Sequence, residues 1–484
     1  MSKNLFAEQL DLSEFSASTL ADWKVAAEAT LKGKPLEKLT SQTPDGLKVE
    51  PIYQPENTVR LPGAENDPGV FPYVRGTRSS VNWHTVDAGT DVVPARWSNV
   101  AADEIHEAGG SAVQEVAFAW AAGLKLLREA ESVGLSVDEA AGRLRFTFAA
   151  GGEFFVALAK LRAARFGWAR IVTACGGSPE AARMVIHART SRWQQSSLDP
   201  HTNMLRSTVS AYAAVLGGCD SLEVSPFDEV FREPDNFSRR IAHNTQTILR
   251  DECRADAVAD PAGGSWFVES LTREIAEAAW GELQKSEQEG GEDGVSKSAQ
   301  KQRNTLSQRR RIMVGVNQYA DPGEQPLPAT RRTGAERLAG GFEQLRANAR
   351  AFAARQGDTP KIFLLTMGPV RQHKARADFV RGFLEPGGFA VLYPSGFETA
   401  EAAAQAARES GALAAVLCST DETYPELVPA VLTTLGGKLP VFLAGYPAEH
   451  VASFQAAGIS DFIHVKADCG AFLAAWQQKL GVLS

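Results

Sequence analysis

His373 is the residue whose type and position best suit metal chemistry. It follows an apolar run typical of a buried strand, Ile362–Thr366, and precedes a helical pattern that begins near Lys374. A neutral imidazole on such a loop is a common ligand of transition metals. The neighbours Arg371 and Arg376 are cations that donate hydrogen bonds and accept none, so neither can orient the ring through its second nitrogen. A lone histidine in a loop is more often a surface residue than a ligand.

A second polar group lies in residues 187–193, which read His-Ala-Arg-Thr-Ser-Arg-Trp. The side chains of His187, Thr190 and Ser191 can donate to or accept from a polar substrate. The same segment holds two arginines, whose long cationic side chains fill space that a ligand would need. Two interpretations stay open, a substrate-binding segment and the structural end of a strand.

Residues 97–285 alternate between helical and apolar patterns. Helices are predicted at Ala108–Ser132, Gly151–Phe166, Pro179–His187, Asp199–Leu216, Asp235–Cys253 and Trp266–Gln288, and strands at Leu144–Phe148, Trp168–Thr173 and Ser221–Ser225. This alternation favours a parallel sheet of βα units, and a (β/α)8-type barrel is the natural candidate. Only about five or six units can be counted against the eight of a full barrel. Little strand-like sequence stands between Arg78 and Trp97, so the barrel is expected to be shortened.

Residues 361–484 alternate most clearly. Strands are predicted at Ile362–Thr366, Ala390–Tyr393, Ala414–Leu417, Val441–Ala444 and Phe462–Val465, and helices at Lys374–Leu384, Thr399–Ser410, Glu422–Leu435, Ala448–Ala457 and Cys469–Leu480. This pattern predicts a doubly wound, flavodoxin-like α/β domain, whose ligand crevice lies at the carboxyl ends of the strands.

The remaining segments are connections and an arm. Residues 1–54 read as an N-terminal helix, with Leu12, Phe15 and Trp23 near helical spacing, followed by a hairpin that we expect to wrap a partner chain. Residues 55–320 would form the barrel domain, with a short strand at Ile312–Asn317. Residues 321–360 are a proline-rich linker and a spacer helix, and 361–484 the last domain.

Composition limits the function. The chain has 484 residues, 44 % hydrophobic and 22 % charged, with a net charge of −8. This charge argues against nucleic acid as the main partner. No apolar run is long enough to span a membrane and no secretory pattern opens the chain, so we expect a cytoplasmic protein. Its five cysteines form no CxxC pair, which favours reduced, buried thiols over disulfides or zinc.

Several segments match one family. They are Thr43-Pro-Asp-Gly46, Pro72-Tyr-Val-Arg-Gly76, Glu107-Ala-Gly-Gly-Ser-Ala-Val-Gln-Glu-Val-Ala-Phe118, Phe154-Phe-Val-Ala-Leu-Ala-Lys-Leu-Arg-Ala-Ala-Arg165, Ser225-Pro-Phe-Asp-Glu229, Phe237-Ser-Arg-Arg-Ile-Ala-His-Asn-Thr-Gln246 and Asp260-Pro-Ala-Gly-Gly-Ser-Trp-Phe-Val-Glu269. In these motifs the chain resembles the methylmalonyl-CoA mutase family over nearly its whole length. The resemblance implies a barrel that holds an acyl-CoA and a C-terminal domain of the cobalamin-binding type, with His373 as the candidate cobalt ligand.

The resemblance also shows where this chain departs from the family. Active chains carry Asp-x-His-x-x-Gly in the cobalt loop, where this chain has Arg371 and Arg376 in place of the Asp and the Gly. The tail cavity of the cofactor would be lined by Ser419-Thr-Asp421 and Ala444-Gly445. The lost carboxylate removes the group that orients the imidazole, and the arginine at the glycine position fills the niche for the tail.

Substitutions in the barrel segments likewise indicate a lost site. A family tyrosine is Arg78 here, a family histidine is Glu104, and a glutamine and a glycine of the substrate pocket are Arg189 and Arg192. His187, Thr190 and Ser191 are then vestigial substrate-binding residues, and no residue of this chain is assigned a catalytic role or a metal.

These observations predict the small subunit of a heterodimeric methylmalonyl-CoA mutase, an isomerase of propionate metabolism. The chain would be non-catalytic and would stabilise a large catalytic chain, which holds the adenosylcobalamin and the acyl-CoA. The alternative is an adenosylcobalamin-dependent acyl-CoA mutase active on its own, for which His373 would have to bind cobalt. A third hypothesis is a scaffold without a mutase partner.

Overall fold

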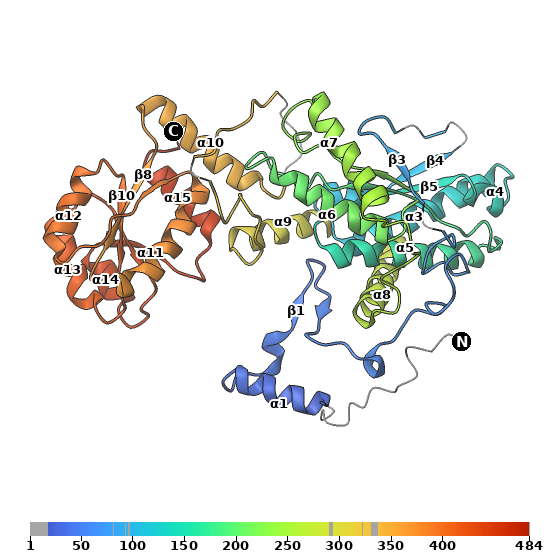
Figure 1. Cartoon of the computed structure of the whole chain (residues 1–484), viewed down its shortest axis with the longest axis horizontal. Helices are drawn as coiled ribbons and strands as arrows, with labels where there is room; N and C mark the ends of the chain where they lie inside the picture. The colour runs from blue at the N-terminus through green and yellow to red at the C-terminus, as the bar shows by residue number, and fades with distance from the viewer. Residues whose placement is uncertain are drawn as a thin grey trace, which may run out of the picture. The chain divides into compact units, whose positions relative to one another are not determined.

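The structure is a computed structural model that describes residues 18–80, 82–91, 93–94, 97–289, 294–321, 323–330 and 337–483 (Figure 1). The chain divides into two compact units, Met1–Thr58 and Val59–Ser484. It is an α/β protein with two parallel sheets, as the alternating patterns predicted. None of the helices in the described ranges is both long and apolar enough to cross a bilayer.

The first unit contains a helix and a hairpin, as predicted. Helix α1, Leu20–Thr30, starts at a capping box between Thr19 and Asp22, which satisfies the free N–H groups of its first turn. Strands β1, Ser41–Gln42, and β2, Lys48–Val49, pair antiparallel. None of the residues of α1 is buried. The predicted contributions of Leu12 and Phe15 lie outside the described residues.

The first sheet of the second unit has five parallel strands in the order β3-β7-β6-β5-β4. These are β3 (His84–Val86), β4 (Ser98–Ala101), β5 (Leu144–Ala150), β6 (Val185–Thr190) and β7 (Ser221–Glu223). Strands β4 to β7 are adjacent in chain order, whereas β3, the first in sequence, lies beyond β7. A closed eight-stranded barrel is not confirmed, because β3 and β4 end the sheet and no described strand joins them.

Helices pack against the first sheet and against one another. They are α2 (Asp103–Glu107), α3 (Ala112–Ser132), α4 (Val137–Ala141), α5 (Phe154–Ala174), α6 (Thr202–Leu216), α7 (Asn236–Thr247) and α8 (Trp266–Glu289). Helices α3, α5 and α6 contact the strands, and α8 packs on α3 and α5. Trp168 of α5 meets Phe146 of β5 with ring centroids 4.8 Å apart. Gly167 lies against Trp120 of α3 so closely that a Cβ there would clash with the indole. These contacts make α3, α5 and β5 the buried core of this domain.

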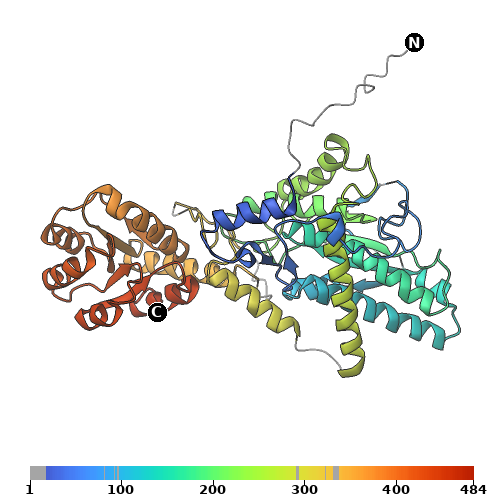
Figure 2. The ribbon, with the colours of Figure 1, turned by 90° about the horizontal axis from the view of Figure 1, so that it is seen from below.

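The second sheet also has five parallel strands, in the order β9-β8-β10-β11-β12, which is that of doubly wound flavodoxin-like folds. The strands are β8 (Lys361–Thr366), β9 (Ala390–Leu392), β10 (Ala414–Cys418), β11 (Val441–Ala444) and β12 (Ile459–Ile463). Helices lie on both sides of the sheet, as Figures 1 and 2 show for its orange and red ribbons.

Alternate residues of the second sheet supply two separate cores. Ile362 and Leu364 pack with α10 (Gly340–Gln356), α11 (Val370–Leu384) and α15 (Cys469–Lys479). Phe363 and Leu365 pack with α12 (Ala400–Glu409), α13 (Tyr424–Leu435) and α14 (Val451–Ala457).

Several element predictions were wrong. The predicted strand Trp168–Thr173 is the second half of α5, since a helix buried on most sides carries no polar stripe to identify it. Residues 179–184 form turns, and the predicted helix there ends in β6, because pairing with β5 overrides the local pattern. Residues 312–317 make a turn with one isolated bridge and no strand, and the charged connector before them contains α9, Gly294–Ser307.

Two further elements differ in extent. Strand β3 occupies the stretch between Arg78 and Trp97 where little strand sequence was expected, since a three-residue strand gives almost no pattern. The last strand is Ile459–Ile463 rather than Phe462–Val465.

Replacing Trp168 with alanine tests the packing of the buried helix α5. Trp168 is fully buried, so we expect a loss of about 3–5 kcal/mol in the free energy of unfolding from the deleted contacts and the cavity. Urea unfolding followed by circular dichroism measures it. Val133→Ala, at a position 75 % exposed, is the control and should change stability by less than about 0.5 kcal/mol. Equal losses in the two variants would contradict the packing described.

Candidate functional site

The face of the first sheet opposite the helices is polar. Side chains alternate along β6, so His187 and Arg189 point to one face while Ile186 and Ala188 point to the helices. The register places His187 beside Ser221 and Arg189 beside Glu223 on β7. A parallel sheet of βα units binds ligands at the carboxyl ends of its strands, so this face is the candidate functional site.

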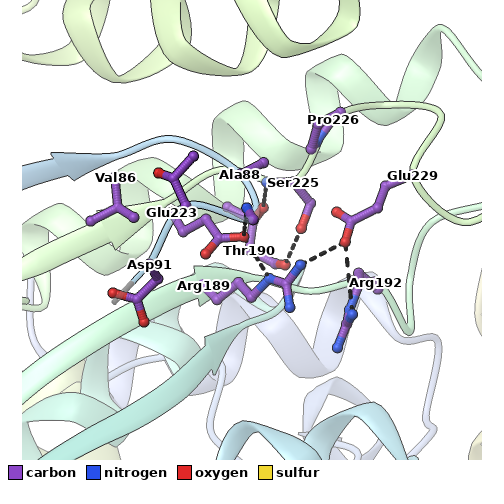
Figure 3. Close-up of polar contacts among 12 residues, drawn as sticks. Val86, Ala88, Asp91, Arg189, Thr190, Arg192, Glu223, Ser225, Pro226 and Glu229 are labelled. Carbon is purple, nitrogen blue, oxygen red and sulfur yellow. Dashed lines mark hydrogen bonds and ion pairs between the residues drawn. The ribbon is translucent and has the colours of Figure 1, made fainter. Parts of the chain in front are cut away.

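Arg189 lies at the centre of this face (Figure 3). Its guanidinium is 3.1 Å from a carboxylate oxygen of Glu223 and donates a 2.6 Å hydrogen bond to Glu229. The guanidinium of Arg192 lies 3.7 Å from the same Glu229 oxygen. The Glu223 side chain is 5 % exposed and burial raises its pKa, while Arg189 opposes that rise. The two arginines and two glutamates therefore form one compensated network.

The connection after β3 crosses the same face. The carboxylate of Asp91 receives two hydrogen bonds from Arg145 of β5, at 2.8 and 2.6 Å, and these bonds hold the pKa of Asp91 below its usual range. Gly89 N–H donates to Glu223 at 3.4 Å, and Arg239 of α7 donates to the carbonyl of Ala88 at 2.9 Å. Residues 87–91 are thus tied to β5, β7 and α7.

The three predicted substrate residues have different hydrogen-bond partners. His187 Nδ1 is 2.8 Å from Ser221 Oγ, and its Nε2 is 3.9 Å from Asp91. Thr190 bonds twice to Ser225, accepting its N–H at 2.8 Å and its hydroxyl at 3.0 Å. Burial lowers the pKa of His187 to about 4, so its imidazole is neutral at pH 7.

Ser191 has a partner that the sequence analysis missed. Its hydroxyl lies 2.7 Å from Nε2 of His106, on α2. The resemblance had directed attention to Glu104 of the same helix, which is exposed. The sequence does contain an indication of this contact, because His106 stands two residues after Glu104. Burial, with the cations Lys160 and Arg311 adding to it, lowers the pKa of His106 well below its usual range.

A buried acid holds the end of β6 in place. Glu107 of α2 accepts the backbone N–H of Arg192 at 2.9 Å, and its carboxylate is 3.7 Å from the Arg192 guanidinium. Burial raises the pKa of Glu107 to about 7. The chain therefore has carboxylates around both Arg189 and Arg192, which explains how two cations are tolerated there.

His373 is not on a loop. Helix α11 begins at Val370, three residues before His373, so His373 lies in the first turn of the helix. The residue is 2 % exposed. Its Nδ1 lies 3.1 Å from the carbonyl of Gly368. A Cβ at Gly396, where φ is +131°, would sit 3.1 Å from Cε1 of this ring. The imidazole therefore packs under the segment that follows β9, and the loop prediction was wrong because the helical pattern extends through it.

Arg376 closes the crevice at the carboxyl ends of the second sheet. It donates to the carbonyl of Ala444 at 3.1 Å and pairs with Asp421 at 2.9 Å. Its guanidinium lies 5.2 Å from the ring centroid of Tyr424, a cation–π distance. A Cβ at Gly445 would be 3.0 Å from this guanidinium. The structure thus brings together the predicted tail-cavity segments and the arginine predicted to fill them.

The remaining sequence candidates lie elsewhere. Arg78 pairs with Asp220, 2.8 Å away, just before β7 and hence at the amino ends of the strands. Cys219, Cys418 and Cys469 are buried, as expected of structural thiols, but Cys175 and Cys253 are exposed because they end helices at the surface. Within the described residues no three metal-ligating side chains converge on one point.

The sequence of this chain is similar to those of known proteins. A model of the family described as methylmalonyl-CoA mutase matches residues 93–356. The chain is 33 % identical over 445 residues to the methylmalonyl-CoA mutase small subunit of Porphyromonas gingivalis, covering 86 % of this chain and 72 % of that protein. It is 38 % identical to the small subunit of Streptomyces virginiae, covering 78 % and 63 %.

A third relative is a protein named methylmalonyl-CoA mutase, from Rhizobium meliloti. It is 41 % identical over 236 residues, which cover 46 % of this chain and 33 % of that protein. The chain belongs to the methylmalonyl-CoA mutase family. It spans about two thirds of the length of the curated small subunits that it matches, between 58 % and 72 %.

Replacing Arg189 with methionine tests the network. It leaves Glu223 and Glu229 buried without their main counter-charge, so we expect a loss of about 3–5 kcal/mol in the free energy of unfolding at pH 8. Without the cation the folded-state pKa of Glu223 rises further above its unfolded value. The carboxylate is therefore protonated in acid, and the loss should shrink as the pH falls from 8 to 5.

Chemical unfolding at each pH measures this loss. The control is Lys374→Met, which removes an exposed ion pair with Asp378 at 3.0 Å and should cost less than about 1 kcal/mol at any pH. A loss in Arg189→Met that is the same at pH 5 and pH 8 would show that the buried carboxylates are not its cause.

Proposed function

We propose that this chain is the small, non-catalytic subunit of a heterodimeric methylmalonyl-CoA mutase. It binds and stabilises a large catalytic chain, which holds the adenosylcobalamin and the acyl-CoA and interconverts methylmalonyl-CoA and succinyl-CoA. Two curated relatives carry the name small subunit at 33 % and 38 % identity. Residues 1–54 wrap the partner, and the exposed helix α1, with no buried residue, suits that role.

The first sheet supports the proposal as a barrel that lacks three βα units. A full barrel has eight strands, and the described residues supply five of them. In a closed barrel the first strand pairs with the last strand, and β3 pairs with β7 in the same way. The missing units then fall between β3 and β4, which are joined by residues 87–97 alone. A crossover between parallel strands takes a dozen or more residues, so this connection has no room for one.

The polar face of the first sheet also supports the proposal, because charged side chains of the chain itself pair across it. Acyl-CoA needs an open channel and groups free to polarise a thioester. Here Arg189 is engaged by Glu223 and Glu229, and Asp91 by Arg145. The single observation that carries the proposal is this internal pairing across the face where a substrate would lie.

The residues of the second sheet do not fit adenosylcobalamin. A histidine ligand needs one ring nitrogen that the metal can reach, besides an acceptor for the other nitrogen. His373 is buried within a helix, and Arg376 occupies the crevice beside Gly445. No catalytic step is therefore assigned to this domain. The cytoplasmic location and the domain boundaries of the sequence analysis stay predictions.

Mixing the purified chain with adenosylcobalamin tests which chain holds the cofactor. We expect no change in the visible spectrum of the cofactor with this chain alone, and no isomerisation of methylmalonyl-CoA. Co-expression with a large mutase chain that carries the Asp-x-His-x-x-Gly loop should yield a one-to-one complex with both properties.

One variant, used in the complex and in the lone chain, makes this test more specific. His373→Ala in the complex should leave the spectrum and the turnover unchanged, since the ring is buried within the fold of this chain and the large chain supplies the cobalt ligand. Stoichiometric corrinoid binding by the lone chain, lost in His373→Ala, would instead establish the alternative of a mutase active on its own.

A further inference from the structure

Helices α3, α5 and α8 surround an apolar cavity that opens to the surface. The three helices pack on one another (Figure 1), and the cavity between them has a volume of about 790 Å³. All three helices contribute to its walls, through Trp120, Leu124, Phe166, Ile171, Ala276 and Trp280. Small-molecule sites have volumes of about 300–1,000 Å³ and are likewise lined mainly by apolar and aromatic side chains.

Packing within the domain core fixes the shape of this cavity. Trp120 of its wall is 1 % exposed and donates its indole N–H to the carbonyl of Ala164 at 3.0 Å. Trp280, which is 45 % exposed, lies at the opening, and its ring centroid is 6.5 Å from that of Trp120. Because these walls are held by the fold, a ligand would pay little to order them, which favours binding.

The cavity is long enough for an extended chain of carbon atoms. Its lining residues on α5 include Phe166, Arg170 and Ala174, which follow one another at intervals of four and so lie along one side of the helix. At a rise of about 1.5 Å per residue, this side of the cavity is about 12 Å long.

One cation at the cavity has no counter-charge. The lining side chains with polar ends are Arg170, Cys175 and Glu277. Glu277 is paired with Arg273 of the same helix at 2.8 Å, so its charge is compensated. Within the described part of the chain, the exposed Arg170 has neither an ion pair nor a hydrogen-bond partner for its guanidinium. The cavity therefore combines apolar walls with a single guanidinium that is free to bind an anion.

We propose that this cavity binds a free fatty acid, with its alkyl chain between the three helices and its carboxylate on Arg170. A guanidinium matches a carboxylate through two parallel hydrogen bonds, and the alkyl chain gains by leaving water. A neutral ligand would leave Arg170 unpaired, and a cationic one would be repelled by it. The inference does not use the proposed function, since the cavity is separate from the polar face of the first sheet.

Calorimetry with decanoate and the full chain tests the inference. We expect one site with a dissociation constant of about 10–100 µM, an ordinary affinity for a ligand of this size. Decanol has the same chain without the charge and should bind about 10-fold more weakly, since hydrogen bonds to charged groups are the stronger ones. Butyrate, which has the charge but too short a chain to fill the cavity, should not bind at these concentrations.

Thiol modification shows whether decanoate occupies this cavity. Cys175 and Cys253 are exposed, and Cys175 alone of the two lines the cavity. With decanoate at ten times its dissociation constant, a thiol reagent should modify Cys175 about 10-fold more slowly, because only about a tenth of the sites are then empty. The rate at Cys253 should not change, so this residue is the internal control.

Two variants separate the role of the charge from that of the walls. Arg170→Met should weaken decanoate binding about 10-fold and leave decanol binding unchanged, since only the charged head group contacts the guanidinium. Arg240→Met, at an exposed position of α7 outside the cavity, is the matched control and should bind both ligands as wild type does. Ala174→Trp fills part of the cavity from an exposed position and should weaken both ligands, with circular dichroism confirming that the variant is folded.

Each outcome decides a different point. Equal affinities for decanoate and decanol, or equal decanoate binding by wild type and Arg170→Met, would overturn the assignment of a carboxylate. Unchanged modification of Cys175 in decanoate would overturn the assignment of the cavity. Protection of Cys175 by a large mutase chain but not by decanoate would make the cavity part of a protein interface instead. A chain that binds decanoate yet forms no complex with a large mutase chain would contradict the proposed function alone.

Discussion

The ion pairs of Arg189 with Glu223 and Glu229 are the interaction on which the first sheet depends. A sheet covered by helices on one side needs its other face either filled or wet. Here charged side chains from neighbouring strands fill that face and pair with each other. Burying a guanidinium is costly unless its donors are engaged. The register of β6 and β7 offsets this desolvation cost, because it places Arg189 directly beside Glu223.

The short connection between β3 and β4 makes this arrangement possible. With no βα unit between them, residues 87–91 run over the polar face and bring Asp91 to Arg145. The connection therefore contributes charge to the face as well as joining its strands. Under the proposal of a shortened barrel, the segment that stands in place of the missing units would also fill the space of a channel.

The sequence predicted most of the fold and the changes in the site, but not how those changes are accommodated. Strong periodicity located α6, α8 and the second sheet. It failed for Trp168, whose helix is buried on most sides, and for β3, which is three residues long. Arg189 was recognised as foreign to a ligand pocket, yet its partners come from β7 and the loop beyond it, which only tertiary pairing brings close. Likewise, the contact between Ser191 and His106 joins residues 85 apart in sequence.

Both domains use the same device at the edge where their folds would bind a ligand. In the first sheet Arg189 and Arg192 are held by carboxylates from α2 and from the segment after β7. In the second, Arg376 is held by Asp421 and by the carbonyl of Ala444. A guanidinium offers five donors in a fixed plane, so it can take over a polar space that a ligand once satisfied. In both places the guanidinium is paired within the chain, so its charge is compensated with no ligand bound.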